Sequence, residues 1–309
     1  MKTAVVTGAA GFIGSHLCDA LLEKGFKVIA VDSLITGNKA NIAHLGKNKR
    51  FSFVKKDIVK GFSANGHIDF VFNLASPASP VDYQKIPMET ILANSIGTKN
   101  MLDFALKKKA VFVEASTSEV YGDPLEHPQR ETYNGNVSIN GPRACYDESK
   151  RFGEMLSTYY GTELGLKARI ARIFNTYGPR MRANDGRVIP NFITQALAGK
   201  PLTVYGDGKQ TRSFCYVSDL VDGLLKLAFS NYGRPVNLGN PEEMTMLELA
   251  EKIRALTGSK SDVFFMPLPE DDPAKRKPDI SVAEKELDWK PRVSTDEGLK
   301  KTIEFFRKK

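Results

Sequence analysis

Short runs of hydrophobic residues alternate with amphipathic stretches through the first half of the chain. The predicted strands are residues 3–7, 27–31, 51–54, 69–74, 111–116 and 168–174. The predicted helices, where apolar side chains recur near helical spacing, are residues 12–24, 88–109 and 143–164. Apolar strands with little polar alternation, separated by helices, are typical of a parallel sheet that is buried on both faces. The pattern therefore predicts an α/β fold with a Rossmann-type, doubly wound parallel sheet.

The pattern changes after about Phe174. Loop-rich segments and short strands are then interspersed with predicted helices at residues 188–199, 218–229, 245–257 and 296–308. We interpret residues 1–174 as the Rossmann domain and residues 175–309 as a smaller C-terminal α/β lobe, with the chain crossing between them more than once. The Pro-rich segment 266–278 is a predicted loop, and we interpret Asp271–Asp272 as a turn before Pro273, not as a metal-binding pair.

Composition narrows the class of protein. The chain has 309 residues, of which 41% are hydrophobic, and none of its apolar runs approaches the roughly 18 residues of a membrane span. The N-terminal residues do not resemble a secretion signal, and the three cysteines, Cys18, Cys145 and Cys215, form no CxxC motif. We therefore expect a cytoplasmic protein. The four histidines do not stand at ligand spacing with the cysteines, so no metal site is expected.

The formal net charge of +8 is the unusual feature of the composition. Such an excess is compatible with a nucleic acid, an acidic membrane surface or a small anionic ligand as partner. Lysine and arginine are spread along the chain apart from short runs at residues 107–109, 275–277 and 307–309. A nucleic-acid-binding surface would instead need basic residues clustered with aromatic ones. We therefore expect a small anionic ligand, and neither a nucleic acid nor a membrane.

A glycine motif lies between the first predicted strand and the first predicted helix. Gly8, Gly11 and Gly14 form a GxxGxxG pattern, and Asp32 ends the second strand. Glycine lets the backbone turn tightly and approach a pyrophosphate, whose charge is met by the helix N-terminus. An acid at the end of the second strand accepts hydrogen bonds from both ribose hydroxyls and repels a 2′-phosphate. The motif predicts a dinucleotide site that prefers NAD to NADP.

Two later segments fit the same cofactor. Asp57 and Ile58 follow the third strand, where the carboxylate either accepts a hydrogen bond from the adenine amino group or is an ordinary solvated loop acid. Residues 74–76 end the fourth strand, at the sheet edge where open α/β folds bind their ligands.

A catalytic set follows from the spacing of Tyr146 and Lys150. These residues are four apart on a predicted helix and so share one face. An ammonium beside a phenol favours the phenolate, so we expect Lys150 to lower the pKa of Tyr146 and make it a general base for a sugar or alcohol hydroxyl. Hydroxyl groups also follow the strand at 111–116, where Thr117 and Ser118 both qualify as a bridge between the substrate oxygen and the phenol.

Several longer strings of residues are distinctive. They are residues 74–80 (LASPASP), 116–124 (STSEVYGDP), 141–151 (GPRACYDESKR), 171–181 (ARIFNTYGPRM), 201–214 (PLTVYGDGKQTRSF) and 271–280 (DDPAKRKPDI). Over nearly the whole chain the sequence resembles the extended short-chain dehydrogenase/reductases, and among them the UDP-glucuronic acid decarboxylases. The resemblance implies the Rossmann-type fold, NAD as a cofactor regenerated in each turnover, and a UDP-sugar as substrate.

The resemblance also implies a reaction and roles for particular residues. Tyr146 would take the proton of the C4 hydroxyl while NAD⁺ takes the hydride; the resulting β-keto acid loses CO₂, and the hydride returns to C4. The catalytic residues it implies are Thr117, Glu119, Tyr146, Lys150 and Arg276, with Glu119 acting at the C5/C6 end and Arg276 anchoring the substrate. The cofactor-binding residues are Gly8, Gly11, Phe12, Ile13, Gly14, Asp32, Ser33, Asp57, Ile58, Leu74, Ala75, Ser76, Tyr146 and Lys150.

For the nucleotide-sugar, the same resemblance implies a second set of contacts. They are Asn175, Arg187, Val188, Asn191, Tyr205, Gln210, Arg212 and Arg276. The family also implies a homodimer in which the helices near 88–109 and 143–164 form a four-helix bundle. The chain departs from the family pattern at Glu89 and Leu92, which stand where lysines are expected, one of them facing the substrate.

Three other functions fit parts of the pattern. A UDP-sugar 4-epimerase would keep Tyr146, Lys150 and NAD but would not need Glu119 or Arg276. A nucleotide-sugar 4,6-dehydratase would need an Asp-Glu pair where this chain has Ser118–Glu119. A non-catalytic NAD-binding regulator would have a broken Tyr/Lys/hydroxyl set, and here the set is intact. The sequence therefore favours the decarboxylase.

Overall fold

The computed structural model describes residues 1–268 and 275–308, so Asp271 and Asp272 lie outside the described residues. A seven-stranded parallel sheet has the order β11-β6-β5-β4-β1-β2-β3. Its strands are β1 (Thr3–Thr7), β2 (Lys27–Asp32), β3 (Phe51–Lys55), β4 (Phe70–Asn73), β5 (Val111–Thr117), β6 (Ala168–Ile173) and β11 (Pro235–Leu238). This strand order is that of a Rossmann sheet with one added strand, and it confirms the predicted fold class.

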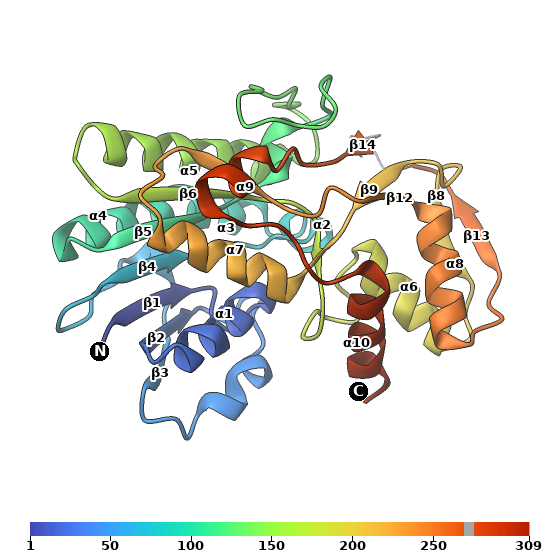
Figure 1. The fold of residues 1–309 in the computed structure, drawn as a ribbon, viewed down its shortest axis with the longest axis horizontal. Coiled ribbons are helices and arrows are strands. Elements are labelled where there is room, and N and C mark those ends of the chain that lie inside the picture. The colour runs from blue at the N-terminus through green and yellow to red at the C-terminus, as the bar shows by residue number, and fades with distance from the viewer. Residues whose placement is uncertain (269–274, 309) are drawn as a thin grey trace.

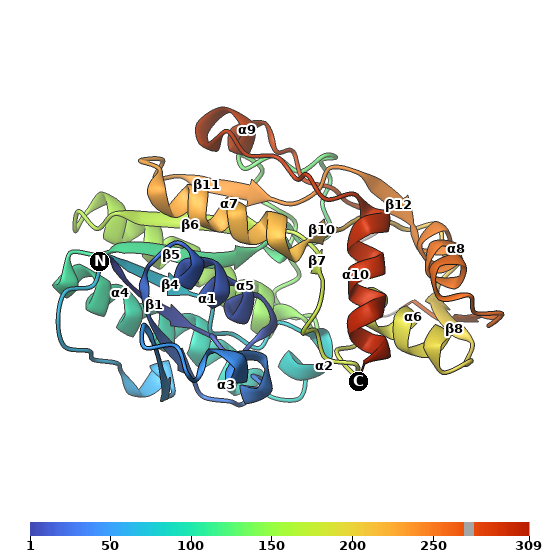
Figure 2. The ribbon, with the colours of Figure 1, turned by 60° about the horizontal axis from the view of Figure 1, so that its bottom comes forward.

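Helices cover both faces of this sheet (Figures 1 and 2). One face carries α3 (Pro87–Leu92), α4 (Thr98–Lys108) and α5 (Ala144–Thr162). The other face carries α1 (Phe12–Glu23), α7 (Val217–Phe229) and α9 (Ser281–Leu287). Covered on both sides, the central strands need no polar face, which is why β4 is buried at every position. A π-helical turn, Ala93–Gly97, joins α3 to α4 within the predicted helix 88–109.

In the described part of the chain, the second lobe is built from short strands and three further helices, on the right of Figure 1. The helices are α6 (Val188–Leu197), α8 (Met246–Thr257) and α10 (Thr295–Arg307), and α2 (Pro80–Tyr83) is a short turn near the cavity described below. The strands pair as β8 (Leu202–Tyr205) with β13 (Val263–Met266), as β9 (Thr211–Ser213) with β12 (Glu243–Thr245) and β14 (Lys275–Arg276), and as β7 (Thr176–Tyr177) with β10 (Cys215–Tyr216).

The chain returns from the second lobe to the large sheet. α7 and β11 both follow Phe174 in sequence, yet β11 pairs with β6 and α7 packs beside α1. One cluster of buried apolar residues runs from the α1 and α7 side of the sheet into the second lobe, and another lies between the sheet and α4. The two lobes therefore share a continuous core.

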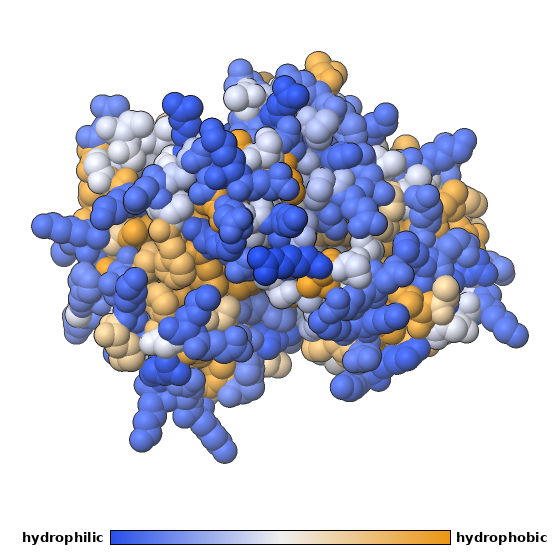
Figure 3. Space-filling view, viewed as in Figure 1, coloured by the Kyte–Doolittle hydropathy of each residue, from blue (hydrophilic) through white to orange (hydrophobic). Residues whose placement is uncertain are grey.

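The surface is mixed in character. Hydrophilic residues cover most of the face in Figure 3, and hydrophobic residues form several separate groups on it. Among the described residues, no helix combines the length and the apolar character needed to cross a membrane.

Candidate active site

A cavity of about 1010 Å³ lies at the carboxyl ends of the parallel strands, between the sheet and the second lobe. Its wall contains every residue that the sequence predicted for the cofactor, the catalytic set and the nucleotide-sugar. Open α/β sheets bind ligands at this edge, outside the carboxyl ends of the strands. Residues spread from Gly8 to Arg276 are thus brought into one site.

The glycine motif forms a loop that only glycine can make. Gly8 has a φ of +65°, and a Cβ on it would lie 2.6 Å from the carbonyl oxygen of Leu74. A Cβ on Gly14 would lie 2.2 Å from the carbonyl oxygen of Gly8, so helix α1 packs directly on the loop. Among the described side chains none caps the start of α1, which leaves its first N–H groups available to an anion. This loop fits the pyrophosphate of a dinucleotide.

Asp32 and Asp57 continue the dinucleotide wall. Asp32 accepts hydrogen bonds from the backbone N–H groups of Ala10 and Leu34, each at 2.8 Å. Burial raises the pKa of Asp32, and these two N–H groups oppose that shift. Asp57 caps the short 3₁₀ turn that follows β3 by accepting from Val59 N–H at 2.9 Å. Both carboxyl groups are fixed by backbone donors, and both face the cavity as the residues of an NAD site should.

Tyr146 is buried on α5 and stacks on Tyr83, with ring centroids 5.0 Å apart and planes 6° from parallel. The predicted lowering of its pKa is wrong for this structure. Burial raises the Tyr146 pKa, while a hydrogen bond with Thr117 and the charge of Arg187 lower it. Of the two hydroxyl residues that the spacing left open, Thr117 is therefore the one that contacts the phenol.

Lys150 does not act on Tyr146 in the way its spacing suggested. Its ammonium donates to the carbonyl oxygen of Ala115 at 2.8 Å and lies 3.8 Å from a carboxylate oxygen of Glu114. Burial lowers the Lys150 pKa, and the charges of Glu114 and Glu154 raise it. The ammonium is thus fixed by β5, beneath the cavity it helps to line.

Glu119 is held between two arginines. Arg143 donates to one carboxylate oxygen at 2.5 Å, and Arg276 donates to the other. Burial raises the Glu119 pKa, but Arg276 and Arg143 outweigh it and bring the pKa to about 2. The neighbouring carboxyl of Asp147 behaves oppositely: burial and the charge of Glu119 raise its pKa to about 7. At neutral pH, Glu119 is an anion paired with two guanidinium groups, so the three side chains together carry a net positive charge.

Arg276 reaches the site through a strand ladder. β14 pairs with β9 so that Arg276 lies beside Arg212, and Arg276 also donates to the carbonyl oxygen of Gly122 at 2.8 Å. The following residues are tied to the first lobe, because Lys277 N–H donates to the side chain of Gln129 at 2.8 Å. Arg276 is only 3% exposed, so it belongs to the site wall and not to the surface.

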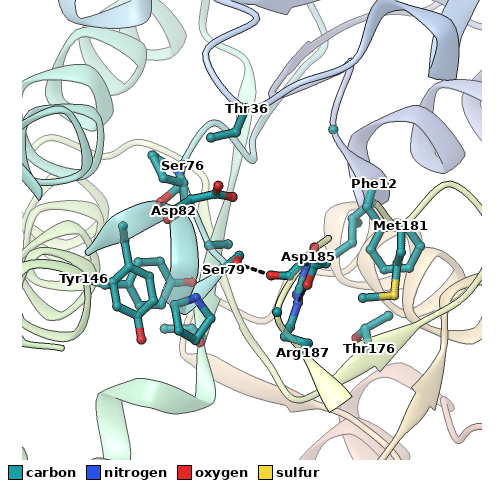
Figure 4. Close-up of a pocket in the computed structure, with 18 of the residues that line it drawn as sticks. Phe12, Thr36, Ser76, Ser79, Asp82, Tyr146, Thr176, Met181, Asp185 and Arg187 are labelled. Carbon is teal, nitrogen blue, oxygen red and sulfur yellow. Dashed lines mark hydrogen bonds and ion pairs between the residues drawn. The ribbon is translucent and has the colours of Figure 1, made fainter. Parts of the chain in front are cut away.

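A second group of polar and charged side chains lines the cavity, and Figure 4 shows Ser79, Asp82, Asp185 and Arg187 among them. Ser79 donates to the carbonyl oxygen of Asp185, and Arg182 forms an ion pair with Asp82. Arg187 is paired with the carboxylate of Asp185. Segments from the two lobes therefore meet across the cavity through hydrogen bonds and ion pairs.

Tyr205 and Gln210 lie together on the cavity wall. Tyr205 is 38% exposed and lines the cavity, so it is not part of the apolar core. Gln210 donates to the carbonyl oxygen of Tyr205 at 2.7 Å. Glu89 and Leu92 line the cavity as well, and Leu92 adds an apolar surface where the family pattern led us to expect a lysine.

Several residues that line the cavity or contact its lining side chains were missed by the sequence analysis. They are Tyr83, Glu114, Arg143, Asp147, Arg182 and Asp185. Arg143 stands three residues before Tyr146, a helical spacing that could have placed it on the same face. Asp147 and Asp185 lie within four residues of their partners, Arg143 and Arg187. Tyr83, Glu114 and Arg182 carry no local signal, because their partners lie on distant segments.

The strand order, the glycine loop with Asp32, and the Thr117, Tyr146 and Lys150 set define an extended short-chain dehydrogenase/reductase. The chain belongs to the NAD dependent epimerase/dehydratase family, whose model matches residues 4–239. It is 52% identical over 303 residues to UDP-glucuronic acid decarboxylase 1 of Arabidopsis thaliana, covering 98% of this chain and 69% of that protein. It is 51% identical over 305 residues to UDP-glucuronic acid decarboxylase 1 of Danio rerio, and the match covers 99% of this chain and 72% of that protein.

A solved structure resembles the whole chain. UDP-glucuronic acid 4-epimerase from Bacillus cereus, in complex with UDP-glucuronic acid and NAD, is 30% identical with a TM-score of 0.88 and covers 99% of both chains. The resemblance stated from the sequence is therefore confirmed.

Proposed function

We propose that the protein is an NAD-dependent UDP-glucuronate decarboxylase that forms UDP-xylose and CO₂. The observation that carries this proposal is the buried ion pair of Glu119 with Arg276. Glu119 lies close enough to Tyr146 for its negative charge to raise the Tyr146 pKa. A guanidinium fixed on Glu119 in the cavity wall serves decarboxylation, whereas a 4-epimerase has no need of it. The identity of about one half to UDP-glucuronic acid decarboxylases over nearly the whole chain supports the substrate.

Tyr146 is the base for the C4 hydroxyl, and the Thr117 hydroxyl bridges the phenol and the substrate oxygen. Bound NAD supplies the oxidant for C4 and gives the hydride back at the end of the cycle. With a ketone at C4 the C6 carboxylate belongs to a β-keto acid, so the C5–C6 bond breaks as its electrons delocalise onto the ketone oxygen. The resulting enolate takes a proton from solvent at C5 before C4 is reduced again. The protein then has to hold the sugar and balance negative charge.

Glu119 and its two arginines provide that balance. A carboxyl with a pKa of about 2 stays ionised at neutral pH, so Glu119 holds Arg143 and Arg276 in place and does not deliver a proton to C5. Arg276 faces the cavity and attracts the C6 carboxylate and the charge that develops as CO₂ leaves. With Leu92 in the position of an expected lysine, this recognition falls to arginine side chains.

The other predicted contacts remain proposals. We assign the diphosphate and sugar to Arg187, Arg212, Asn175 and Asn191, with Val188 packing beside them, and the uracil end to Tyr205 and Gln210, because these residues line the same cavity. The cytoplasmic location stays a prediction.

A single incubation tests the function. Purified protein with UDP-glucuronate and NAD⁺ is followed by NMR of the sugar protons, together with measurement of released CO₂. We expect UDP-xylose and an equal amount of CO₂. UDP-galacturonate without CO₂ would assign the protein as a 4-epimerase, and an unchanged substrate would reject both activities.

We also propose a homodimer formed through α3 and α5. Exposed apolar side chains recur at helical spacing on these two helices, at Met88, Ile91, Phe152, Met155 and Tyr159. Such a stripe suits packing against a second copy of the same helices. Sedimentation of the native protein should give the dimer mass, and Met155→Glu should shift it to the monomer; a wild-type monomer would contradict the proposal.

A further inference from the structure

A buried glutamate lies beneath the active site and has no part in the reaction described above. Glu114 is in the middle of β5, its residue is only 1% exposed, and β5 is covered on both edges by parallel neighbours. A carboxylate is rarely buried to this degree unless it is paired. Its partner is the ammonium of Lys150, 3.8 Å away.

The remaining contacts of Glu114 fix its direction. Asn73 lies opposite Glu114 in the ladder of β4 and β5, and its amide donates to the second carboxylate oxygen at 2.8 Å. The side-chain oxygen of Asn73 accepts a hydrogen bond from the Thr7 hydroxyl at 2.9 Å. The Thr7 oxygen in turn accepts from the N–H groups of Leu74 and Ala75, each at 3.1 Å. A chain of buried polar groups thus connects Lys150 to the strand ends that line the dinucleotide wall.

We propose that Glu114 is a positioning residue for Lys150, whose carboxylate keeps the buried ammonium charged and directed at the active-site cavity. Only the activity measurement that tests this inference depends on the proposed function. It follows from the geometry because Lys150 has one carbonyl partner, Ala115, on the same strand, and an ammonium without a counter-charge at such depth loses its proton readily.

The charges around the pair leave Glu114 as the main counter-ion. Burial lowers the Lys150 pKa, and Glu114 is the strongest charge opposing that shift, followed by Glu154 on α5. Burial also raises the Glu114 pKa, and the charge of Lys150 and the hydrogen bond from Asn73 oppose that shift. Glu154 is already paired with Arg172 of β6 at 2.8 Å and accepts from Ser116. An arginine therefore neutralises the second acid, and its effect on Lys150 is correspondingly smaller.

The pH profile of turnover tests the proposal. In Glu114→Gln the amide keeps the size of the side chain but not its charge, so Lys150 should lose its proton at lower pH. Turnover should follow this protonation because Lys150 lines the cavity and belongs to the catalytic set that the family resemblance implies. We expect the alkaline limb of kcat to move down by about one pH unit or more, with KM unchanged and kcat near pH 6 within about threefold of wild type. Glu114→Asp should restore most of the profile. The matched control is Glu131→Gln, a partly buried acid outside the cavity, whose profile should be that of wild type.

A cycle of unfolding measurements tests the pair without relying on any activity. Glu114→Gln should destabilise the wild-type protein but stabilise Lys150→Met, because in that background the carboxylate is an uncompensated buried charge. If Glu114→Gln alone does not fold, Glu114→Gln/Lys150→Met should still fold. An unmoved alkaline limb, equal destabilisation in both backgrounds, or failure of the double variant to fold would overturn the proposal. Absence of UDP-glucuronate turnover in wild type would reject the proposed function and leave this cycle decisive.

Discussion

Arg276 donates a hydrogen bond to Glu119 although 157 residues separate them in the chain. Glu119 follows the central strand β5, and Arg276 lies on β14 of the second lobe. The pair can form only when the second lobe packs over the carboxyl ends of the sheet. The site is therefore complete only in the folded whole, and this relationship leads to the first prediction.

Arg276→Ala should abolish decarboxylation while leaving the base in place. We expect kcat to fall by at least about 100-fold, because a buried charge next to the reacting group is lost. Glu119 then keeps a single arginine, so stability should fall as well, by about 3–5 kcal/mol. CO₂ release and denaturant unfolding measure the two effects. Lys277→Ala removes a neighbouring cation that pairs with Glu243 outside the cavity and should change neither; full activity of Arg276→Ala would contradict its role.

Tyr146→Phe should separate binding from chemistry. The ring stacked on Tyr83 is kept, and only the phenolic oxygen is removed. We expect the affinity for UDP-sugar, measured by calorimetry, to stay within a few-fold while turnover falls by about 10²–10⁴-fold. Tyr232→Phe, which removes a phenolic oxygen from a tyrosine outside the cavity, serves as the control. A comparable loss of activity in the control, or none in Tyr146→Phe, would contradict the assignment of the base.

Asp147 should make the protein less stable as the pH rises. Its pKa is raised from 3.8 to about 7 in the folded protein, so the folded state resists ionisation, and its cost to stability grows from about pH 4 to pH 7. Asp147→Asn removes this cost. We expect the free energy of unfolding at pH 8 to increase by a few kcal/mol, on the order of 1–4, with little difference from wild type near pH 4.

Unfolding by urea at pH 4, 6 and 8 measures this dependence. Glu119 has the opposite effect on the pH dependence of stability, since its pKa is lowered from 4.5 to about 2 in the folded protein. The stability that it adds is complete above its unfolded pKa and is lost as the pH falls toward 2 in both proteins. If Asp147→Asn lowers the free energy of unfolding by the same amount at every pH, the prediction is contradicted. The carboxyl would then be needed for packing, and its ionisation would not destabilise the folded state.

Asp32→Asn should weaken the preference for NAD over NADP. The carboxylate is held by two backbone N–H groups, and its charge repels a 2′-phosphate. We expect the affinity for NAD to fall by about tenfold or more, since a hydrogen bond to a charged group is worth about 1.5–3 kcal/mol. The affinity for NADP should fall less or rise. Titration of both dinucleotides measures the ratio, and Asp207→Asn, an exposed loop acid, is the control; an unchanged ratio would show that Asp32 does not select the cofactor.

Much of the fold follows from local patterns. The apolar run at Thr3–Thr7 and the glycines after it mark a strand, a tight turn and a helix, because each depends on residues within a few positions. Tyr146 and Lys150 were found in the same way, since residues four apart share a helix face. The strand β11 was not predicted as part of the large sheet, because its partner β6 lies more than sixty positions earlier in the chain.

The electrostatics of the site could not be obtained from spacing. The helical spacing of Tyr146 and Lys150 suggested a lowered phenol pKa, but the ammonium is taken up by Ala115 and Glu114, and burial raises the Tyr146 pKa. Glu114 stands within an apolar run that predicts only a buried strand. Its counter-charge arrives from α5, a separate element.

By itself the sequence determined the class of fold, the glycine loop and the shared helix face of Tyr146 and Lys150, because periodicity, glycine and helical spacing act over short distances. Only the tertiary structure decided which charges meet: Glu119 with Arg143 and Arg276, and Lys150 with Glu114. The physical reason is that charge interactions and burial depend on positions in space, and those positions are set by how strands and lobes pack together.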